Sequence, residues 1–140
     1  MPYSYLHCGK GMNRMNGTKM LLRKRGAMKN EKTVIYISAD SMGRGSEELG
    51  RLLVRNFLYT VNEGEAPWRI IFINSGVQLA VNGSEVMGTL NQIEVKGTEI
   101  LSCGTCLDYF GLKTELAAGR VSNMSEILDS LTKATKIISP

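Results

Sequence analysis

The sequence predicts an α/β fold, in which a mostly parallel sheet carries helices on both faces in a three-layer, flavodoxin-like or Rossmann-like arrangement. Short, nearly continuous apolar and β-branched runs indicate strands that are buried on both sides. These runs alternate with longer segments of helical periodicity, and right-handed crossovers between parallel strands place such helices on both faces. The length of 140 residues fits a single domain of this kind.

The first strand and the first helix are predicted between residues 33 and 62. Residues 33–38 form a β-branched and aromatic run that ends at Asp40 and a glycine-rich turn. Ser46 then offers a capping hydroxyl, and two acidic residues follow it where a helix would begin. Apolar residues recur at near-helical spacing from there to about Asn62, which predicts an amphipathic helix.

The second strand and the second helix follow. Residues 69–73 are predicted to be a buried strand that stops at residues 74–76, Asn-Ser-Gly. Ser84 is the expected cap of a weaker helix with a short apolar stripe, and Gly97 is expected to end it.

The third strand is predicted over residues 98–102, and it leads directly into Cys103. A helical turn is expected around residues 107–110. Asn123, with an acidic residue three positions later, resembles a capping box, and the apolar stripe after it predicts the last helix. Residues 136–138 can close the sheet, so the expected order is strand, helix, strand, helix, strand, helix, helix, strand.

The basic charge of the chain lies near its N-terminus. Residues 1–32 hold eight basic side chains and one acid, whereas the rest of the chain holds nine basic and twelve acidic side chains. We therefore expect residues 1–32 to be a basic, disordered leader and residues 33–140 to be the folded domain. The domain itself is mildly acidic, so we expect no nucleic-acid partner.

Other classes of protein are disfavoured by what the sequence lacks. No segment approaches the roughly 20 apolar residues of a membrane-spanning helix, and the N-terminus does not follow the pattern of a secretory signal. We therefore expect a cytoplasmic protein without a membrane partner. Three cysteines are too few for a disulfide-stapled secreted domain. Zinc needs four ligands, and residues 33–140 hold two cysteines and no histidine, so we expect neither metal nor cofactor.

The cysteine pair is the strongest chemical signal. Cys103 and Cys106 are separated by Gly104 and Thr105, between a predicted strand and a predicted helical turn. A thiol at a helix N-terminus faces unpaired N–H groups, which favour the reactive thiolate. Such a pair can transfer a persulfide or act as a dithiol switch, and a buried cysteine can also be inert packing. Gly104 either lets a substrate approach or only makes the turn.

Three loops are expected to share one crevice, because binding sites in parallel sheets form at the carboxyl ends of the strands. They are residues 40–45, 74–76 and 103–106. The first loop fails the dinucleotide fingerprint, since Glu48 stands where a glycine is required. It can still hold a small anion or simply make a tight turn. The candidate binding residues in and beside these loops are Asp40, Arg44, Gly45, Asn74, Gly76, Gly104 and Tyr109.

From about residue 33 to the C-terminus the chain resembles the DsrE/DsrF-like family of sulfur-handling proteins, and more narrowly the C-terminal domain of YedF-type selenium-metabolism proteins. Cys103 is followed eight residues later by Gly111 and Leu112, as the sulfur-carrying cysteine of the family is. The most specific matching segments are residues 38–45 (Ser-Ala-Asp-Ser-Met-Gly-Arg-Gly) with 48–50, 72–77 (Phe-Ile-Asn-Ser-Gly-Val), 101–109 (Leu-Ser-Cys-Gly-Thr-Cys-Leu-Asp-Tyr) and 123–124.

The resemblance implies a function and partners. It implies a flavodoxin-like sheet, an oligomer, and transfer of sulfane sulfur between proteins, with Cys103 as the carrier and Cys106 as a resolving or assisting thiol. YedF-type proteins usually begin with a TusA-like domain that bears a Cys-Pro motif, whereas here Cys8 is followed by Gly9. The chain is then expected to meet a TusA-like partner in trans or to be a fragment.

The leading hypothesis is a carrier that takes sulfur or selenium on Cys103 from a donor protein and passes it to an acceptor protein. The sequence leaves open whether such a carrier is an enzyme of the sulfurtransferase type. One alternative is a non-catalytic assembly module whose thiols are inert. Another is a redox protein that cycles between a Cys103–Cys106 dithiol and its disulfide.

Overall fold

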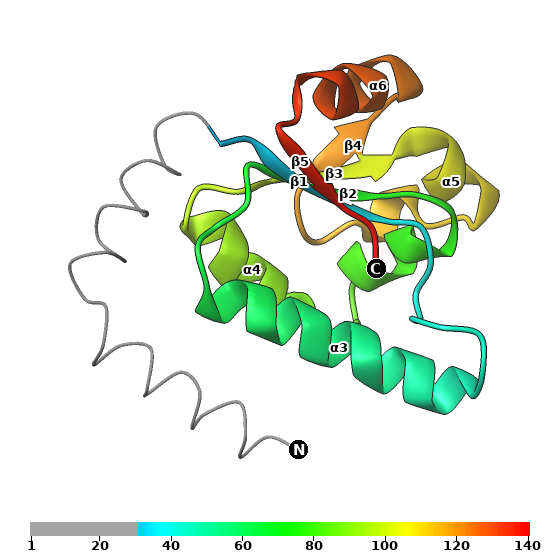
Figure 1. Cartoon of the computed structure of the whole chain (residues 1–140). Coiled ribbons are helices and arrows are strands. Elements are labelled where there is room, and N and C mark those ends of the chain that lie inside the picture. Colours follow the sequence, from blue (N-terminus) through cyan, green and yellow to red (C-terminus); the bar gives the residue numbers. More distant parts are fainter. Residues whose placement is uncertain (1–30) are drawn as a thin grey trace, which may run out of the picture. The chain divides into compact units, whose positions relative to one another are not determined.

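The computed structural model describes residues 31–140, and its centre is a five-stranded sheet in the order β4-β3-β2-β1-β5 (Figure 1). Every neighbouring pair of strands is parallel, which confirms the predicted fold class. Nearly all of the predicted leader, residues 1–30, lies outside the described residues. The strands are β1 (Thr33–Ile37), β2 (Arg69–Phe72), β3 (Glu99–Cys103), β4 (Arg120–Ser122) and β5 (Lys136–Ile138).

Helices cover both faces of this sheet. In Figure 1, α3 and α4 lie on one side of the sheet and α6 lies on the other. The helices thus give the three predicted layers. Their bounds are α3 (Glu47–Glu63), α4 (Met87–Val95), α5 (Gly104–Tyr109) and α6 (Met124–Lys133), with the short 3₁₀ helices η1 (Asn74–Ala80) and η2 (Lys113–Glu115).

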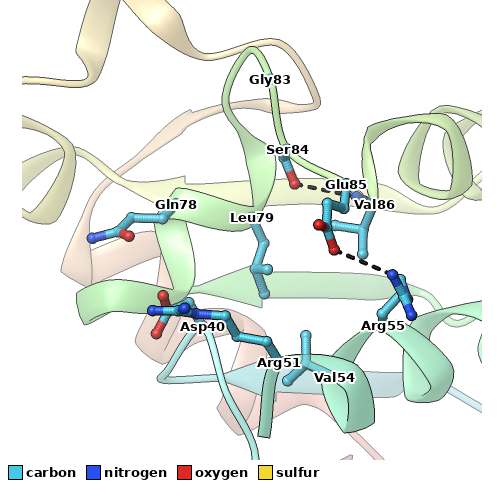
Figure 2. A pocket seen from close by; sticks show the side chains of 10 residues that line it. All are labelled: Asp40, Arg51, Val54, Arg55, Gln78, Leu79, Gly83, Ser84, Glu85 and Val86. Carbon is cyan, nitrogen blue, oxygen red and sulfur yellow. Dashed lines mark hydrogen bonds and ion pairs between the residues drawn. The ribbon is translucent and has the colours of Figure 1, made fainter. Parts of the chain in front are cut away.

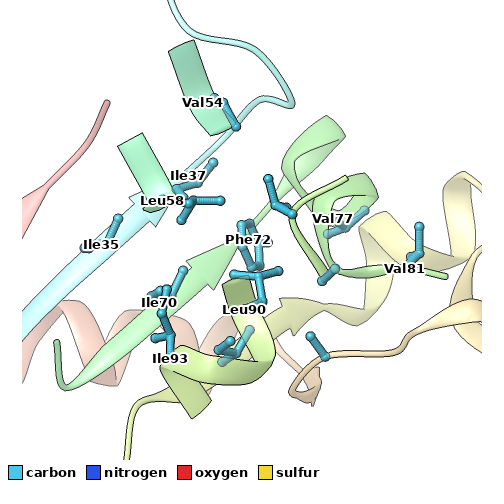
Figure 3. Close-up of a cluster of buried hydrophobic side chains, with 14 of the residues drawn as sticks. Ile35, Ile37, Val54, Leu58, Ile70, Phe72, Val77, Val81, Leu90 and Ile93 are labelled. Carbon is cyan, nitrogen blue, oxygen red and sulfur yellow. The ribbon is translucent and has the colours of Figure 1, made fainter. Parts of the chain in front are cut away.

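The larger core cluster lies between the sheet and the helices α3 and α4. Alternate side chains of β1 and β2 point to this side, and they meet apolar side chains of the two helices (Figure 3). Full burial of each such side chain stabilises the fold by about 1.5–3 kcal/mol. The labelled members include Ile35, Ile37, Val54, Leu58, Ile70, Phe72, Leu90 and Ile93.

A smaller core cluster lies on the opposite face, under α6. The strands β1, β2 and β3 contribute Val34, Ile71, Leu101 and Cys103, and α6 contributes Ile127. Strand alternation explains the membership of Cys103, because residues two apart on β3 point to the same face. The thiol of Cys103 is therefore part of an apolar core.

Two of the three predicted helix caps are confirmed. The Ser46 side chain accepts the N–H of Leu49 at 3.2 Å, and the Asn123 side chain accepts that of Glu126 at 2.9 Å. The expected cap at Ser84 is wrong. Its hydroxyl accepts the N–H two residues later, at 3.3 Å, and so stabilises a local turn, after which α4 begins at Met87.

The sequence analysis missed β4 and η1. Strand β4 has three residues, and only Ser122 of these is buried, so it has neither the length nor the apolar run of a central strand. It pairs with the last three residues of β3 and thereby places Ser122 opposite Cys103. Residues 74–80, expected to begin as a loop, form the 3₁₀ helix η1.

A group of ion pairs joins β2, β3, β4 and α6. Arg120 contacts Glu99 at 3.0 Å and Glu126 at 2.5 Å, and Arg69 contacts Glu99 at 2.8 Å. Hydrogen bonds from Arg120, and then from Ser122, lower the pKa of Glu126 to about 2. These contacts attach the short edge strand β4 and helix α6 to the centre of the sheet.

Candidate functional site

Cys103 is the last residue of β3 and directly precedes α5. It is 2% exposed and packs in the smaller core cluster with Leu101 and Ile127. Its side chain makes no capping hydrogen bond to α5, which is only six residues long. The thiol predicted to carry sulfur is therefore surrounded by apolar side chains.

Cys106 lies in the first turn of α5 and is only partly buried. Its sulfur accepts the backbone N–H of Asn74, with a distance of 3.0 Å between nitrogen and sulfur. Cys106 also packs against both core clusters, so it lies at the carboxyl edge of the sheet, where the two faces meet. Both cysteines are free thiols.

The donor of that hydrogen bond has an unusual backbone. Asn74 has a φ of +50° and is the only described residue other than glycine with a positive φ. This left-handed conformation costs most residues about 1–2 kcal/mol, and asparagine tolerates it better than most. Asn74 follows Ile73, whose N–H donates to the carbonyl of Ile37 at 3.0 Å. Ile73 thus pairs with the end of β1, the next N–H, that of Asn74, donates to Cys106 of α5, and the chain then turns at Asn74.

The surroundings of Cys106 favour its neutral form. Burial raises the pKa of the thiol, the N–H of Asn74 lowers it in part, and the neighbouring thiol of Cys103 raises it again. The sequence analysis predicted that a helix N-terminus would favour a thiolate at this pair. At Cys106 the net direction is the opposite, because desolvation outweighs the single N–H donor.

The three loops expected to share a crevice are linked by hydrogen bonds. The N–H of Asp40 donates to the hydroxyl of Ser75 at 3.3 Å, and the N–H of Asn74 donates to Cys106. The Asp40 side chain, however, lines a pocket of about 220 Å³ to which neither cysteine contributes (Figure 2). The loops converge, but the Asp40 carboxylate and the thiols have different surroundings.

The three glycines that were predicted to line the site, and Arg44, differ from one another in their surroundings. A side chain at Gly76 would collide with the carbonyl oxygen of Ile37, so this glycine allows η1 to approach β1. A Cβ at Gly104 would lie 3.1 Å from Val121, so β4 packs closely against this glycine. Gly45 borders open space, and Arg44 beside it is exposed.

Tyr109, the last predicted site residue, ends α5 and is 84% exposed. Its ring packs edge-on against Phe110, with the ring centroids 5.1 Å apart. Tyr109 follows Cys106 by three residues, so the two side chains lie on the same side of this short helix.

Several polar groups near the site were missed by the sequence analysis. Arg51 and Arg55, one turn apart on α3, line the pocket with Asp40, and Arg55 pairs with Glu85 at 3.3 Å. Their i, i+4 spacing could have placed both arginines on one helix face. The hydroxyl of Ser102 is fully buried and makes no hydrogen bond, which no sequence pattern indicates. A second pocket, of about 820 Å³, lies along the first half of α3 and is lined mainly by residues between Ser46 and Arg55.

Residues 31–140 contain no group of three histidine, cysteine, aspartate or glutamate side chains that could hold a metal ion. None of the helices in this part of the chain is long and apolar enough to span a membrane.

Comparisons with known proteins establish the fold. No family model matches the sequence, and no curated protein does. Among solved structures, the ychN protein of E. coli has a TM-score of 0.60 at 15% identity, covering 79% of this chain and 99% of its own. The protein of unknown function MTH1491 from Methanobacterium thermoautotrophicum has a TM-score of 0.58 at 21% identity, with the same coverages. The conserved protein of unknown function BT1422 from Bacteroides thetaiotaomicron has a TM-score of 0.52 at 16% identity, covering 78% of this chain and 95% of its own.

Proposed function

We propose that this chain is a DsrE/DsrF-like carrier that binds sulfane sulfur, or selenium, on its thiol pair and delivers it to a partner protein. The thiol pair is Cys103 and Cys106. The observation that supports the proposal most is that two free thiols lie together at the carboxyl edge of a parallel sheet, one with an N–H donor on its sulfur. The fold is consistent with the DsrE/DsrF-like resemblance of the sequence.

The transfer needs no cofactor, because atoms and electrons balance within it. A thiolate of the pair attacks the outer sulfur of a donor persulfide, and a new S–S bond forms. The S–S bond of the donor breaks, and the donor leaves as a thiolate that takes up a proton. Delivery is the same exchange with the carrier as the donor, so no net oxidation occurs.

The burial of Cys103 suits the role of holding the sulfur. A persulfide is itself a nucleophile and a target for other thiols, and access controls the rate of such exchange. Because Cys103 is 2% exposed, sulfur held there would be shielded from small thiols in solution. The carrier role of Cys103 therefore accords with its place in the core.

The proposed partners are a sulfur or selenium donor protein and an acceptor. One of them is a TusA-like protein in trans, in place of the N-terminal TusA-like domain that YedF-type proteins usually carry. We also propose a homo-oligomer. Helix α3 exposes Leu49, Leu52, Leu53 and Tyr59, each between 40% and 60% exposed, and burial of this face in an oligomer would remove apolar surface from water.

The test uses the full chain with Cys8→Ser, so that the thiol pair provides the remaining cysteines. After incubation with glutathione persulfide, intact-mass spectrometry should show one added sulfur atom, which dithiothreitol removes. The matched control carries Cys103→Ser and Cys106→Ser together and should gain none. Absence of sulfur on the first protein, or equal gain on both, would refute the carrier.

A second candidate is a dithiol redox protein, and the proximity of the two thiols favours it. Cys103 lies close enough to Cys106 to raise the pKa of its thiol. In glutathione buffers of graded potential, such a protein would form a reversible Cys103–Cys106 disulfide without any sulfane donor. Thiols that form no disulfide and take up no sulfur would instead support the assembly module.

A further inference from the structure

The two thiols of the proposed site differ in how accessible they are to solvent. Cys106, the second cysteine of the pair, is the more accessible one. The resemblance to the DsrE/DsrF-like family points to Cys103 as the carrier, yet Cys103 is 2% exposed. Cys106 is only partly buried and lies beside the exposed residues Asn74, Thr105 and Tyr109. In-line attack requires the donor's outer sulfur to touch the attacking thiol, so accessibility decides which thiol reacts first.

We propose that Cys106 is the thiol that accepts sulfur from the donor, and that the sulfur then moves inward to Cys103. The inference rests on the proposed carrier function and assigns each thiol its step. Cys106 is the outer thiol of the pair and Cys103 is the inner thiol.

Each step balances. In the first, the Cys106 thiolate attacks the outer sulfur of the donor persulfide, the donor's S–S bond breaks, and the donor thiolate leaves and is protonated. In the second, the Cys103 thiolate attacks the outer sulfur of the Cys106 persulfide, and Cys106 leaves as a thiolate. Sulfane sulfur is transferred in both steps, and neither cysteine is left oxidised to a disulfide.

The backbone of Asn74 is the positioning group for the first step. Its N–H lies 3.0 Å from the sulfur of Cys106, and a hydrogen bond to the thiolate offsets part of the rise in pKa that burial causes. The side chain of Cys103 makes no such bond to the helix that follows it. Of the two thiols, the outer one therefore combines access with an N–H donor.

The structure explains why the second cysteine of the motif is the outer one. Cys103 belongs to β3, and strand alternation directs its side chain to the face that α6 covers. Cys106 belongs to α5, which contacts η1, so its sulfur meets the N–H of Asn74, the first residue of η1.

The first experiment measures native reactivity and needs no variant at the site. The full chain with Cys8→Ser is treated briefly with iodoacetamide, and the peptide that contains both cysteines is fragmented in the mass spectrometer. Alkylation should occur first at Cys106. Faster alkylation at Cys103 would overturn the inference.

The second experiment follows loading by glutathione persulfide in Cys103→Ser and Cys106→Ser, each in the Cys8→Ser background. Cys103→Ser keeps the outer thiol, so it should still take up sulfur, at an initial rate at least about tenfold above that of Cys106→Ser. Cys106→Ser should load at least about tenfold more slowly, the factor for a local opening of about 1.4 kcal/mol that exposes Cys103. Circular dichroism confirms that each variant is folded.

The outcomes separate the inference from the function it rests on. If Cys106→Ser loads at the parental rate and Cys103→Ser does not load, Cys103 accepts sulfur directly and the inference is wrong, although the carrier function stands. If the parent protein itself takes up no sulfur, the carrier function fails.

The role of Asn74 has its own readout, the pH profile of Cys106 alkylation. Asn74→Ala strains the left-handed turn and should shift the apparent pKa of Cys106 upward, because the N–H donor is displaced. Asn74→Gly keeps the turn and the N–H, so it should restore the parental profile. Identical profiles for all three proteins would remove Asn74 from the mechanism.

Discussion

At the scale of single residues, Asn74 connects the start of η1 to α5, because its N–H donates to the sulfur of Cys106. The φ of +50° at Asn74 turns the chain away directly after this contact. The sequence analysis selected Asn74 as a residue that lines a crevice. It could not identify the contact, because a backbone N–H is present at every position except proline and leaves no mark in the sequence.

Replacement of Asn74 by a β-branched residue should destabilise the fold. Asn74→Val should lower the free energy of unfolding by about 1–2 kcal/mol, since valine adopts the left-handed conformation poorly. Asn74→Gly is the matched control and should remain within about 0.5 kcal/mol of the parent. Urea denaturation measures both, and a valine variant as stable as the glycine variant would contradict the strain argument.

Ser102 and Ser130 give a matched pair of buried hydroxyls. Ser102 makes no hydrogen bond, whereas Ser130 accepts from Arg69 at 2.5 Å and donates to the carbonyl of Glu126 at 2.8 Å. Ser102→Ala should therefore be neutral or raise the free energy of unfolding by up to about 1 kcal/mol, and Ser130→Ala should lower it by about 1 kcal/mol or more. Equal losses in both variants, measured in urea, would show that Ser102 contributes a hydrogen bond after all.

At the scale of elements, the ion pairs decide how firmly β4 and α6 are attached. Glu126 has a pKa of about 2, lowered mainly by Arg120, against about 4.5 for an unpaired glutamate. The unfolded chain therefore binds a proton first as the pH falls, so the stabilisation is complete above about pH 4.5 and declines toward pH 2.

Glu126→Gln should reduce this pH dependence. The variant should be less stable than the parent at pH 7, and the difference in the free energy of unfolding should shrink at pH 3. At that pH the unfolded parent chain takes up a proton on Glu126, which reduces the stabilisation that the ionised carboxylate gives to the fold. Urea denaturation at the two pH values measures the effect, with the exposed Glu65→Gln as control. A difference that grows toward low pH would have the wrong sign.

The elements also show where sequence reasoning succeeds. Strands β1, β2 and β3 were predicted because both their faces are buried, which leaves an apolar run. Strand β4 was missed because its three residues hold a single apolar side chain, that of Val121, whereas the equally short edge strand β5 has two adjacent isoleucines. The thiol pair was recognised from residue type and spacing. Which thiol is buried depends on the face that α6 covers, and that is a property of packing between distant segments.

At the scale of the whole domain, the two faces of the sheet are covered unequally. Two helices with η1 pack over the larger core cluster, and α6 packs over the smaller one. The outer surface of α3 is rich in exposed leucines, and β5 at the sheet edge exposes Ile137 and Ile138. Both surfaces are available for contacts with other chains, since exposed apolar surface favours association.

The proposed homo-oligomer predicts that a charge on α3 will weaken association. Leu52→Glu should shift the protein to a smaller mass in size-exclusion chromatography with light scattering, because a buried carboxylate is costly at an apolar interface. Val95→Glu on α4 is the control, since Val95 is 88% exposed and lies on another helix. The same mass for Leu52→Glu and the parent protein would exclude this face as the interface.

The tight packing around Cys103 has a consequence for cargo release. A sulfur atom added to a side chain that is already enclosed by Leu101 and Ile127 must displace its neighbours. Extra atoms in a filled core typically cost about 1–3 kcal/mol. The laden protein would then be less stable than the empty one, and the strain relieved on unloading would help to drive the sulfur outward to the acceptor.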